Sequence, residues 1–338
     1  IYFIMNKYIS IFFCVQIIAL NLFAMQPKVT PVDYVRPQID THKSRWFFFS
    51  SASRPFGMVS LSPDTWTEGS WNSGYLYNSK EIRCFSHVHC WQLAGVPVMP
   101  TTGEVKGHKG MDAYKSTYSH ETEIVKPGYH KVELDTYQIR VELTSTSRVG
   151  MHRYTYPAGE KANVLFDVGA LLAHGKTEKA AIHRISSKEI GGYSVLAPTS
   201  RRKKPVTVYF VARFNQNMTA FGGWEKEGKE KKLVHKNSIE GADIGGYASF
   251  GKLKKQTLLM KVGISYVSEE QARINLEKEL AHWNFDRVKE DAFAEWNREL
   301  GKITVEGGSE EEKIKFYTDL WHSLLGRHTF SDFNGKIG

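Results

Sequence analysis

The chain has few cysteines, and their spacing does not favour a disulfide-stabilised fold. Of three cysteines in 338 residues, Cys14 lies in an apolar N-terminal run, which leaves Cys84 and Cys90. In one extended strand these two would lie roughly 20 Å apart at about 3.3 Å per residue, whereas a disulfide needs Cα atoms within about 7 Å. Unless a tight turn separates them, we expect free thiols and no disulfide scaffold. Internal repeats and low-complexity segments are also absent from the sequence.

The sequence also lacks an apolar run long enough to be a clear membrane span, and residues 1–24 are predicted to be a secretory signal peptide. Lys7 is the only charge among them, residues 9–20 are almost wholly apolar, and Ala24 precedes a polar stretch. This order is typical of an export signal. The alternative is a membrane anchor, but the apolar run is shorter than the roughly 20 residues that span a bilayer. We therefore expect an exported protein, periplasmic, surface-held or secreted, with no stable membrane span after cleavage.

The formal net charge of +9 does not by itself indicate a nucleic-acid partner. Much of the excess lies in short runs at 201–204 and 229–232, between predicted strands, where Glu225, Glu227 and Glu230 dilute it. A nucleic-acid interface needs basic residues gathered on one face. We interpret these runs as solvated turns and expect no nucleic-acid binding.

Residues 30–267 carry the alternation of β-strands, and helical periodicity is scarce there. Apolar residues alternate with residues of the other face in several runs, at 132–134, 139–143, 164–168, 206–214 and 258–266. Glycine, proline and asparagine separate the runs. Period two in many short runs predicts a mainly β domain, a large antiparallel two-sheet β-sandwich.

The pattern becomes helical at Ser268. Ser268 with Gln271 predicts a helix N-terminus, and apolar residues then recur at three- and four-residue steps through Leu300. A break is expected near 284–286. We interpret 268–300 as a helical linker.

Residues 301–338 are predicted to begin a second, helical domain. A brief extended piece is expected at 303–305, and Ser309 with Glu312 repeats the capping pattern before a further amphipathic helix. The chain stops at Gly338, soon after this helix and one turn. We therefore expect a truncated gene product that contains only the start of the second domain.

The densest group of polar and aromatic residues runs from Trp66 to Thr102. His87 and His89 in this group flank one residue, so on a strand both would face the same side. One interpretation is a cupin-type metal site, since His-x-His pairs open such sites and imidazole is the commonest metal ligand. Against it, the next acid is Glu104, which comes late.

Two other interpretations of this group stay open from the residues alone. The histidines and tryptophans can be hydrogen-bonded members of the sandwich core or rim, because Trp and Tyr are large apolar fillers. They can also bind a sugar. The apolar CH face of a pyranose stacks on aromatic rings, and neutral His, Asn and Gln side chains bind its hydroxyls without the desolvation cost of a full charge.

Several motifs occur in one order along the chain. They are Arg54-Pro55-Phe56-Gly57-Met58 continuing to Thr65, Gly74-Tyr75-Leu76-Tyr77, Phe85-Ser86-His87-Val88-His89, Met99-Pro100-Thr101-Thr102-Gly103, Trp296-Asn297 with Leu300, Phe316 to His322, and Phe330-Ser331-Asp332. Together they resemble glycoside hydrolase family 92, the exo-acting α-mannosidases. The resemblance covers nearly all of the chain after the predicted signal.

The resemblance implies a β-sandwich joined by helices to an (α/α)6 barrel-like catalytic domain, of which 301–338 would be the start. It implies release of α-linked mannose with inversion, by a general acid and a separate base about 6.5–9.5 Å apart. It also implies a Ca²⁺ cofactor bound to sugar hydroxyls. In this family both carboxylates and most calcium ligands belong to the C-terminal domain. We therefore assign no catalytic residue, since nothing in the spacing of Asp64, Glu68 or Asp332 supports one, and predict that the chain alone is inactive.

By the same resemblance, the sandwich contributes to a pocket for mannose-containing glycans at the domain interface. We predict Trp71, His87, His89 and Trp91 as its contribution. Asp332 is predicted to be the first contribution of the helical domain, a carboxylate that accepts two sugar hydroxyls. The alternative for Asp332 is a cap on the turn after the helix.

One segment departs from the family pattern. Many members carry a glycine- and histidine-rich loop before the Pro-Phe-Gly-Met motif, whereas residues 40–49 here are basic and bulky. If this segment borders the pocket, linkage preference or substrate would differ. The alternative function, from another class, is a freestanding carbohydrate-binding sandwich without catalysis.

Overall fold

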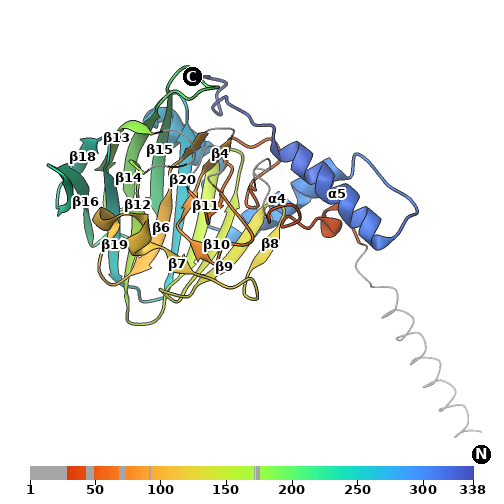
Figure 1. Ribbon diagram of the computed structural model, residues 1–338, viewed down its shortest axis with the longest axis horizontal. Helices are drawn as coiled ribbons and strands as arrows, with labels where there is room; N and C mark the ends of the chain where they lie inside the picture. Colours follow the sequence, from red (N-terminus) through yellow and green to blue (C-terminus); the bar gives the residue numbers. More distant parts are fainter. Residues whose placement is uncertain (1–28, 43–48, 68–73, 91–92, 171, 173–175) are drawn as a thin grey trace, which may run out of the picture.

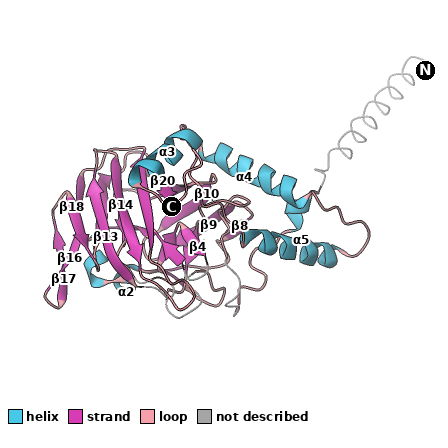
Figure 2. Cartoon of the chain, turned by 90° about the horizontal axis from the view of Figure 1, so that it is seen from above, coloured by secondary structure: helices cyan, strands magenta, loops and turns pink. Residues whose placement is uncertain are grey.

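The structure is a computed structural model that describes residues 29–42, 49–67, 74–90, 93–170, 172 and 176–338. Two antiparallel sheets stack face to face, and three helices lie at one side of them (Figure 1, Figure 2). This confirms the predicted mainly β sandwich followed by helices. The predicted signal peptide lies outside the described residues. No helix in the described part of the chain is long and apolar enough to cross a membrane.

The first sheet has seven described strands. In spatial order they are β1 (Ser62–Asp64), β3 (Cys84–Ser86), β6 (Val98–Thr102), β12 (Lys161–Phe166), β19 (Gly245–Lys252), β16 (Ala220–Glu227) and β17 (Glu230–Val234). The basic run at 229–232 lies at the hairpin between β16 and β17, where Lys232 pairs with Glu227 at 2.7 Å. The charge there is solvated and locally balanced, as expected.

The second sheet has nine described strands. In spatial order they are β18 (Ser238–Gly241), β13 (Thr177–Arg184), β14 (Glu189–Leu196), β15 (Val206–Phe214), β20 (Thr257–Ser265), β11 (Val149–Thr155), β10 (Ile139–Ser145), β9 (Tyr129–Leu134) and β8 (Ile124–Lys126). The short elements outside the two sheets are the ribbons β2 (Glu81–Ile82) with β7 (Ser116–Thr117) and β4 (Val88–Cys90) with β5 (Leu93–Gly95), the 3₁₀ turns η1 (Pro31–Tyr34) and η2 (Gly107–Lys109), and α2 (Met111–Tyr114).

The main core fills the space between the two sheets. The alternation in β15 places Val208, Phe210 and Phe214 in this core, each fully buried. Phe210 stacks on Phe166 of the facing sheet at 5.9 Å between ring centroids. The alternation of apolar residues along the strands therefore has the cause expected from the sequence, because one face of each strand packs on the opposite sheet.

Three helices follow the sandwich; the first two cover the outer face of the nine-stranded sheet, and the third packs against η1 and the second helix. They are α3 (Glu269–Glu279), α4 (Phe285–Leu300) and α5 (Glu310–Leu325). Ser268 caps α3 by accepting from the Gln271 backbone, and Asn284 caps α4, so the predicted helix start and break are confirmed. Val211 of β15 is buried on this outer face with Leu276 of α3.

A separate apolar cluster joins η1 to α4 and α5. It contains Val32, Val35, Trp296 and Trp321, all fully buried. Ser309 and Glu312 form the expected reciprocal capping box of α5. The predicted extended piece at 303–305 forms no strand, because no neighbouring strand pairs with it.

Candidate functional site

The predicted histidine pair lies in the interior of the sandwich. The chain bends at His87, between β3 and β4, so His87 and His89 do not share one strand as the spacing suggested. The cause is that β3 belongs to the seven-stranded sheet whereas β4 pairs with β5. The two residues are 0% and 2% exposed.

His87 belongs to a buried hydrogen-bond chain. Its Nε2 lies 2.8 Å from Nε2 of His152 on β11, and its Nδ1 lies 2.7 Å from the Val96 carbonyl. The Tyr154 hydroxyl lies 2.8 Å from His152 Nδ1. Gly150 leaves room for the His87 ring, since a Cβ there would come within 2.7 Å of it.

Both imidazoles of this chain are neutral at ordinary pH. Burial lowers the pKa of His87 to about 4 and places the pKa of His152 well below its usual value. One direction of donation then satisfies every group. Tyr154 donates to His152, His152 Nε2–H donates to His87 Nε2, and His87 Nδ1–H donates to the Val96 carbonyl.

His89 is held by a buried carboxylate. Its Nε2 lies 2.9 Å from Asp64 Oδ1 and its Nδ1 lies 2.6 Å from the Ser60 carbonyl. Burial opposes the imidazolium, but the charge and hydrogen bond of Asp64 outweigh it, and the pKa of His89 is raised. Asp64, one of the carboxylates considered from the sequence, is therefore the counter-ion of a buried histidine. Its side chain is 0% exposed.

These contacts favour the interior interpretation of His87 and His89, and their predicted role in binding sugar stays a prediction. Trp71, Trp91 and Glu68 lie outside the described residues. Among the residues that the structure does describe, neither histidine belongs to a group able to hold a metal ion, as a cupin-type site would require.

Asp332 lies at a buried node between the sandwich and the helices. Its Oδ2 accepts from the Ser265 hydroxyl at 2.9 Å, and its Oδ1 accepts from Asn275 Nδ2 at 2.7 Å. The residue is 1% exposed. Both carboxylate oxygens thus have protein donors. These bonds join the sandwich to α3 and do not cap the turn after the helix, as the alternative for Asp332 had it; its role as a sugar ligand stays a prediction.

A further buried cluster was not recognised from the sequence. Ser51 Oγ lies 2.8 Å from His130 Nδ1, and His130 Nε2 lies 3.0 Å from Glu123 Oε1. Tyr75 and His120 donate to the other oxygen of Glu123. The order hydroxyl, imidazole, carboxylate is that of a nucleophilic triad. However, Ser51 and His130 are 0% exposed, so a substrate has no access to the hydroxyl.

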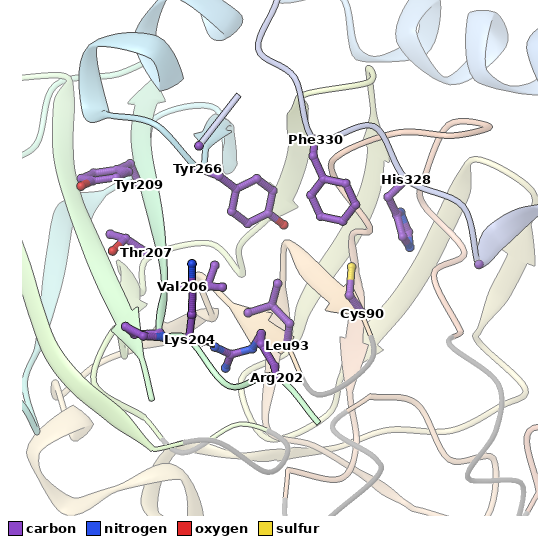
Figure 3. Close-up of a pocket in the computed structure, with 13 residues that line it drawn as sticks. Cys90, Leu93, Arg202, Lys204, Val206, Thr207, Tyr209, Tyr266, His328 and Phe330 are labelled. Atoms are coloured by element: carbon purple, nitrogen blue, oxygen red, sulfur yellow. Dashed lines mark hydrogen bonds between the residues drawn. The ribbon is translucent and has the colours of Figure 1, made fainter. Parts of the chain in front are cut away.

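An open cavity lies where several distant segments meet at one end of the sandwich (Figure 3). Its volume is about 890 Å³. β4 and β5, the start of β15, the residue after β20 and the C-terminal segment 326–338 contribute to it. The lining residues are Cys90, Leu93, Arg202, Lys204, Pro205, Val206, Thr207, Tyr209, Tyr266, Gly326, His328, Phe330 and Gly338.

Specific contacts fix the C-terminal segment beside the cavity. His328 Nδ1 lies 3.0 Å from the Gly57 carbonyl, and Thr329 donates its backbone N–H to Phe56 at 2.9 Å. Arg148 Nε donates to the Ser331 carbonyl at 2.7 Å. Together with the hydrogen bonds of Asp332, these bonds hold Phe330 at the cavity. The Phe330 side chain is still 52% exposed.

The cavity lining combines aromatic rings, uncharged polar groups and two cations. Tyr266 and Phe330 present rings whose centroids are 5.5 Å apart. Burial raises the pKa of the Cys90 thiol to about 12 and lowers the pKa of His328, so both are uncharged near neutral pH. Arg202 and Lys204 supply the charge.

No Asp or Glu side chain appears among the described lining residues. The cavity can therefore bind a ligand, but its described lining offers no carboxyl side chain of the kind that general acid–base hydrolysis of a glycoside requires.

Sequence reasoning missed most of this cavity. Arg202 and Lys204 belong to the basic run that was interpreted as a solvated turn. The Arg202 guanidinium donates to the carbonyls of Ala197 and Lys204 at 2.7 and 2.5 Å, which folds this loop toward the cavity. Two features of the sequence pointed toward the cavity. Cys90 is adjacent to Trp91, which was predicted to bind sugar, and Phe330 belongs to the same family motif as Asp332.

Of the unusual segment 40–49, residues 43–48 lie outside the described residues. Its two described ends have different surroundings. Asp40 lies beside Asp319 and His322 of α5. Phe49 stacks on Tyr75 at 4.2 Å between centroids.

Comparison with known families places two domains along the chain. Residues 34–265 match the Glycosyl hydrolase family 92 N-terminal domain, and residues 271–337 match the Glycosyl hydrolase family 92 catalytic domain. The second match includes α3 and α4, which the sequence analysis interpreted as a linker. That finer division of the chain stays a prediction.

Solved structures of similar proteins support the same grouping. A family GH92 α-mannosidase of Bacteroides thetaiotaomicron matches with a TM-score of 0.82 and 29% identity over 93% of this chain and 43% of that one. The same enzyme in complex with mannoimidazole matches with a TM-score of 0.80 and 29% identity, over 91% of this chain and 42% of that one. A family GH92 inverting mannosidase of B. thetaiotaomicron VPI-5482 matches at 0.77 with 24% identity, over 92% of this chain and 42% of that one, which supports the fold.

A curated relative agrees. It is an uncharacterized secreted glycosidase of Arthroderma benhamiae, 23% identical over 85% of this chain and 40% of its own length. The chain thus spans about two fifths of the length of the relatives that it matches.

Proposed function

Because the chain belongs to glycosyl hydrolase family 92, we propose that it forms part of an exported α-mannosidase-like hydrolase that releases terminal α-linked mannose. The observation that carries the proposal is the position of the cavity. Cys90, Lys204 and Tyr209 come from the region matched to the N-terminal domain, and His328 and Phe330 come from the region matched to the catalytic domain. A ligand in this cavity would contact both.

In this proposal the described residues bind and orient the sugar. Tyr266 and Phe330 offer rings to the apolar face of a pyranose, and Thr207 and Lys204 offer donors to its hydroxyls. The cavity is part of the substrate site rather than the whole of it.

The general acid and the general base are proposed to lie in the part of the family's catalytic domain beyond the matched residues. The absence of an Asp or Glu side chain from the described lining of the cavity supports this. An inverting hydrolase needs two carboxyl groups with room for a water between them. The chain alone is accordingly proposed to be inactive.

Calcium is proposed as the cofactor of the whole enzyme, but the described lining of the cavity does not fit it. Ca²⁺ takes six to eight oxygen ligands. The cavity lining offers two cations and no Asp or Glu side chain among its described residues. The proposed calcium ligands are therefore not among the described residues of the cavity, and no step of the reaction is assigned to the ion here.

The test compares the chain with a protein that carries it together with a complete family catalytic domain. Each is incubated with 4-nitrophenyl α-D-mannopyranoside, and nitrophenol release is measured with and without added CaCl₂. We expect turnover by the longer protein alone and loss of that turnover on chelation. ¹H NMR of the first product should show the β-anomer of mannose.

Comparable turnover by the chain alone would contradict the proposed position of the acid and base. Calorimetric binding of mannose by both proteins, without hydrolysis by either, would instead support a carbohydrate-binding sandwich.

A further inference from the structure

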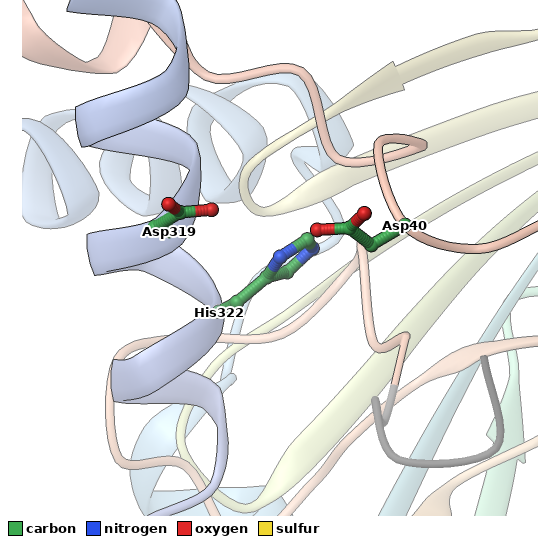
Figure 4. A group of neighbouring side chains, drawn as sticks. All are labelled: Asp40, Asp319 and His322. Carbon is green, nitrogen blue, oxygen red and sulfur yellow. The ribbon is translucent and has the colours of Figure 1, made fainter.

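Three side chains with metal-binding atoms converge where the N-terminal segment meets α5. Asp40 lies in the turn that follows η1, and Asp319 and His322 lie on α5 (Figure 4). Their ligand atoms all lie within 4.8 Å of one another. Figure 4 shows both carboxylates close to the imidazole ring. No other group of this kind occurs in the described part of the chain.

The helix brings two of the three together. Asp319 and His322 are three residues apart on α5, so their side chains lie on the same face of the helix. Carboxylate–x–x–histidine pairs at this spacing serve as metal ligands in helical proteins. Asp40 approaches from a segment far away in the sequence, which gives the third ligand a different direction.

The surroundings of His322 match those of a metal ligand. The residue is 8% exposed, and its Nε2 lies 3.4 Å from the Pro37 carbonyl. Donation of the Nε2–H to that carbonyl would place the lone pair on Nδ1. Histidines that bind metals are typically oriented through such a bond from the other ring nitrogen.

Independent contacts hold the two segments in place. Arg36 donates its backbone N–H to Thr318 Oγ1 at 3.0 Å, one residue before Asp319. Val35 is buried with Trp321 and Tyr317 in the cluster that joins η1 to α5. The three ligands therefore sit on elements that are already packed together, as a metal site requires.

Lys315 lies at the cluster, with its Nζ 2.5 Å from Asp319 Oδ2. The lysine side chain is 63% exposed, so this ion pair is worth little and is easily displaced. Asp40 and Asp319 bring two negative charges together. A divalent ion would neutralise both.

We propose that Asp40, Asp319 and His322 bind a divalent transition-metal ion of the Zn²⁺ class, which fastens the N-terminal segment to α5. One imidazole and two carboxylates suit Zn²⁺ and leave a position for water. The same set is too poor in oxygen for a Ca²⁺ cage. The site is thus distinct from the calcium proposed for the whole enzyme, and it does not depend on the proposed function.

The test is a calorimetric titration of the chelator-treated chain with ZnCl₂. We expect one equivalent to bind, with affinity reduced at least tenfold in Asp40→Asn and in Asp319→Asn. Glu310→Gln is the matched control, because it removes one exposed acid from the same helix outside the cluster, and its affinity should equal that of the unaltered chain. Lys315→Gln should bind more tightly, because it removes the competing cation from Asp319.

Two further measurements separate coordination from general charge attraction. Co²⁺ should give visible d–d absorption in the unaltered chain that disappears in His322→Ala and in Asp40→Asn. ZnCl₂ should raise the melting temperature of the unaltered chain and leave that of Asp40→Asn unchanged.

Equal affinity in the unaltered chain and the two aspartate variants would overturn the proposal, as would the absence of stoichiometric binding. An affinity of Lys315→Gln that stays the same or falls would also count against the site, since the lysine would then not compete for Asp319. These outcomes do not bear on mannosidase activity.

Discussion

The interior of the sandwich and the cavity at its end use polar side chains in opposite ways. In the interior, His87, His152 and Tyr154 form one chain of donors and acceptors with no exposed surface. At the cavity, Phe330 is half exposed and Lys204 reaches the same open space. Buried polar groups that are fully paired define a single packing, whereas groups around an open space can serve a ligand. Residue type does not separate these roles, but the number of partners does.

The largest effect expected from this comparison concerns the buried pair Asp64–His89. Asp64→Ala removes the carboxylate that stabilises the imidazolium form of His89. The Asp64 side chain is 0% exposed, so water cannot easily replace the lost partner. Removal of one partner of a buried ion pair costs about 3–5 kcal/mol. Urea unfolding should show a loss of that size.

Asp112→Ala provides the control for Asp64→Ala, because Asp112 is an aspartate of the same region whose side chain is 72% exposed. It should change stability by less than about 0.5 kcal/mol. Equal effects of the two substitutions would mean that the pair is not part of the interior framework.

The second effect is a pH dependence of stability from His87. The folded pKa of about 4 lies below the ordinary 6.5, so the unfolded chain binds more protons between these values. Stability should therefore be complete above pH 6.5 and fall as the pH drops toward 4. The shift corresponds to an effect on the order of 3 kcal/mol.

Unfolding free energy measured from pH 7 to pH 4 should have a shallower slope in His87→Gln than in the unaltered chain. His89 contributes with the opposite sign, because its pKa is raised, so the difference between the two proteins is the informative quantity. His235→Gln, at an exposed histidine, should keep the original slope. An unchanged slope in His87→Gln would show that its imidazole is not buried in the neutral form.

The third effect lies at the boundary between the two regions. Asp332→Ala removes the acceptor of Ser265 and of Asn275. Hydrogen bonds to a charged group contribute about 1.5–3 kcal/mol, and we expect a loss near 2 kcal/mol by urea unfolding. Proteolysis after Arg327 and Lys336 should become faster. Asp332→Asn retains an acceptor and should lose less. A stable Asp332→Ala protein with impaired mannoside binding would instead restore the sugar-ligand role predicted from the sequence.

The sequence was sufficient for the fold because the fold depends on local periodicity. The alternation at 206–214 corresponds to β15, the caps Ser268 and Ser309 begin α3 and α5, and the break expected near 284–286 lies where α4 begins. Each of these signals lies within a few residues. The exception, 303–305, lacked a partner strand, which a local pattern cannot reveal.

The site was less accessible to prediction because its contacts are distant in the sequence. The buried His87 ring contacts His152, which is 65 residues away in the sequence. The buried Asp332 carboxylate accepts a hydrogen bond from Ser265, which is 67 residues away. The spacing His-x-His carries no information about either partner. Similarly, Arg202 resembled part of a solvated basic run until its bonds to the loop carbonyls placed it beside the cavity.

The smallest effect on stability, and the sharpest test of the cavity, is expected for Phe330→Ala. Because the side chain is 52% exposed, its removal should lower the unfolding free energy by only about 1 kcal/mol, half of what full burial of a Phe side chain contributes. Stacking on an aromatic ring contributes about 0.5–1.5 kcal/mol, which corresponds to roughly a 2- to 12-fold rise in KM for an aryl α-mannoside. The measurement uses the protein that carries a complete catalytic domain. Phe330→Tyr keeps the ring and should retain the original KM. A lower melting temperature with unchanged KM would place Phe330 with the packing residues, and the contrast between a paired interior and a ligand-binding end would lose its main support.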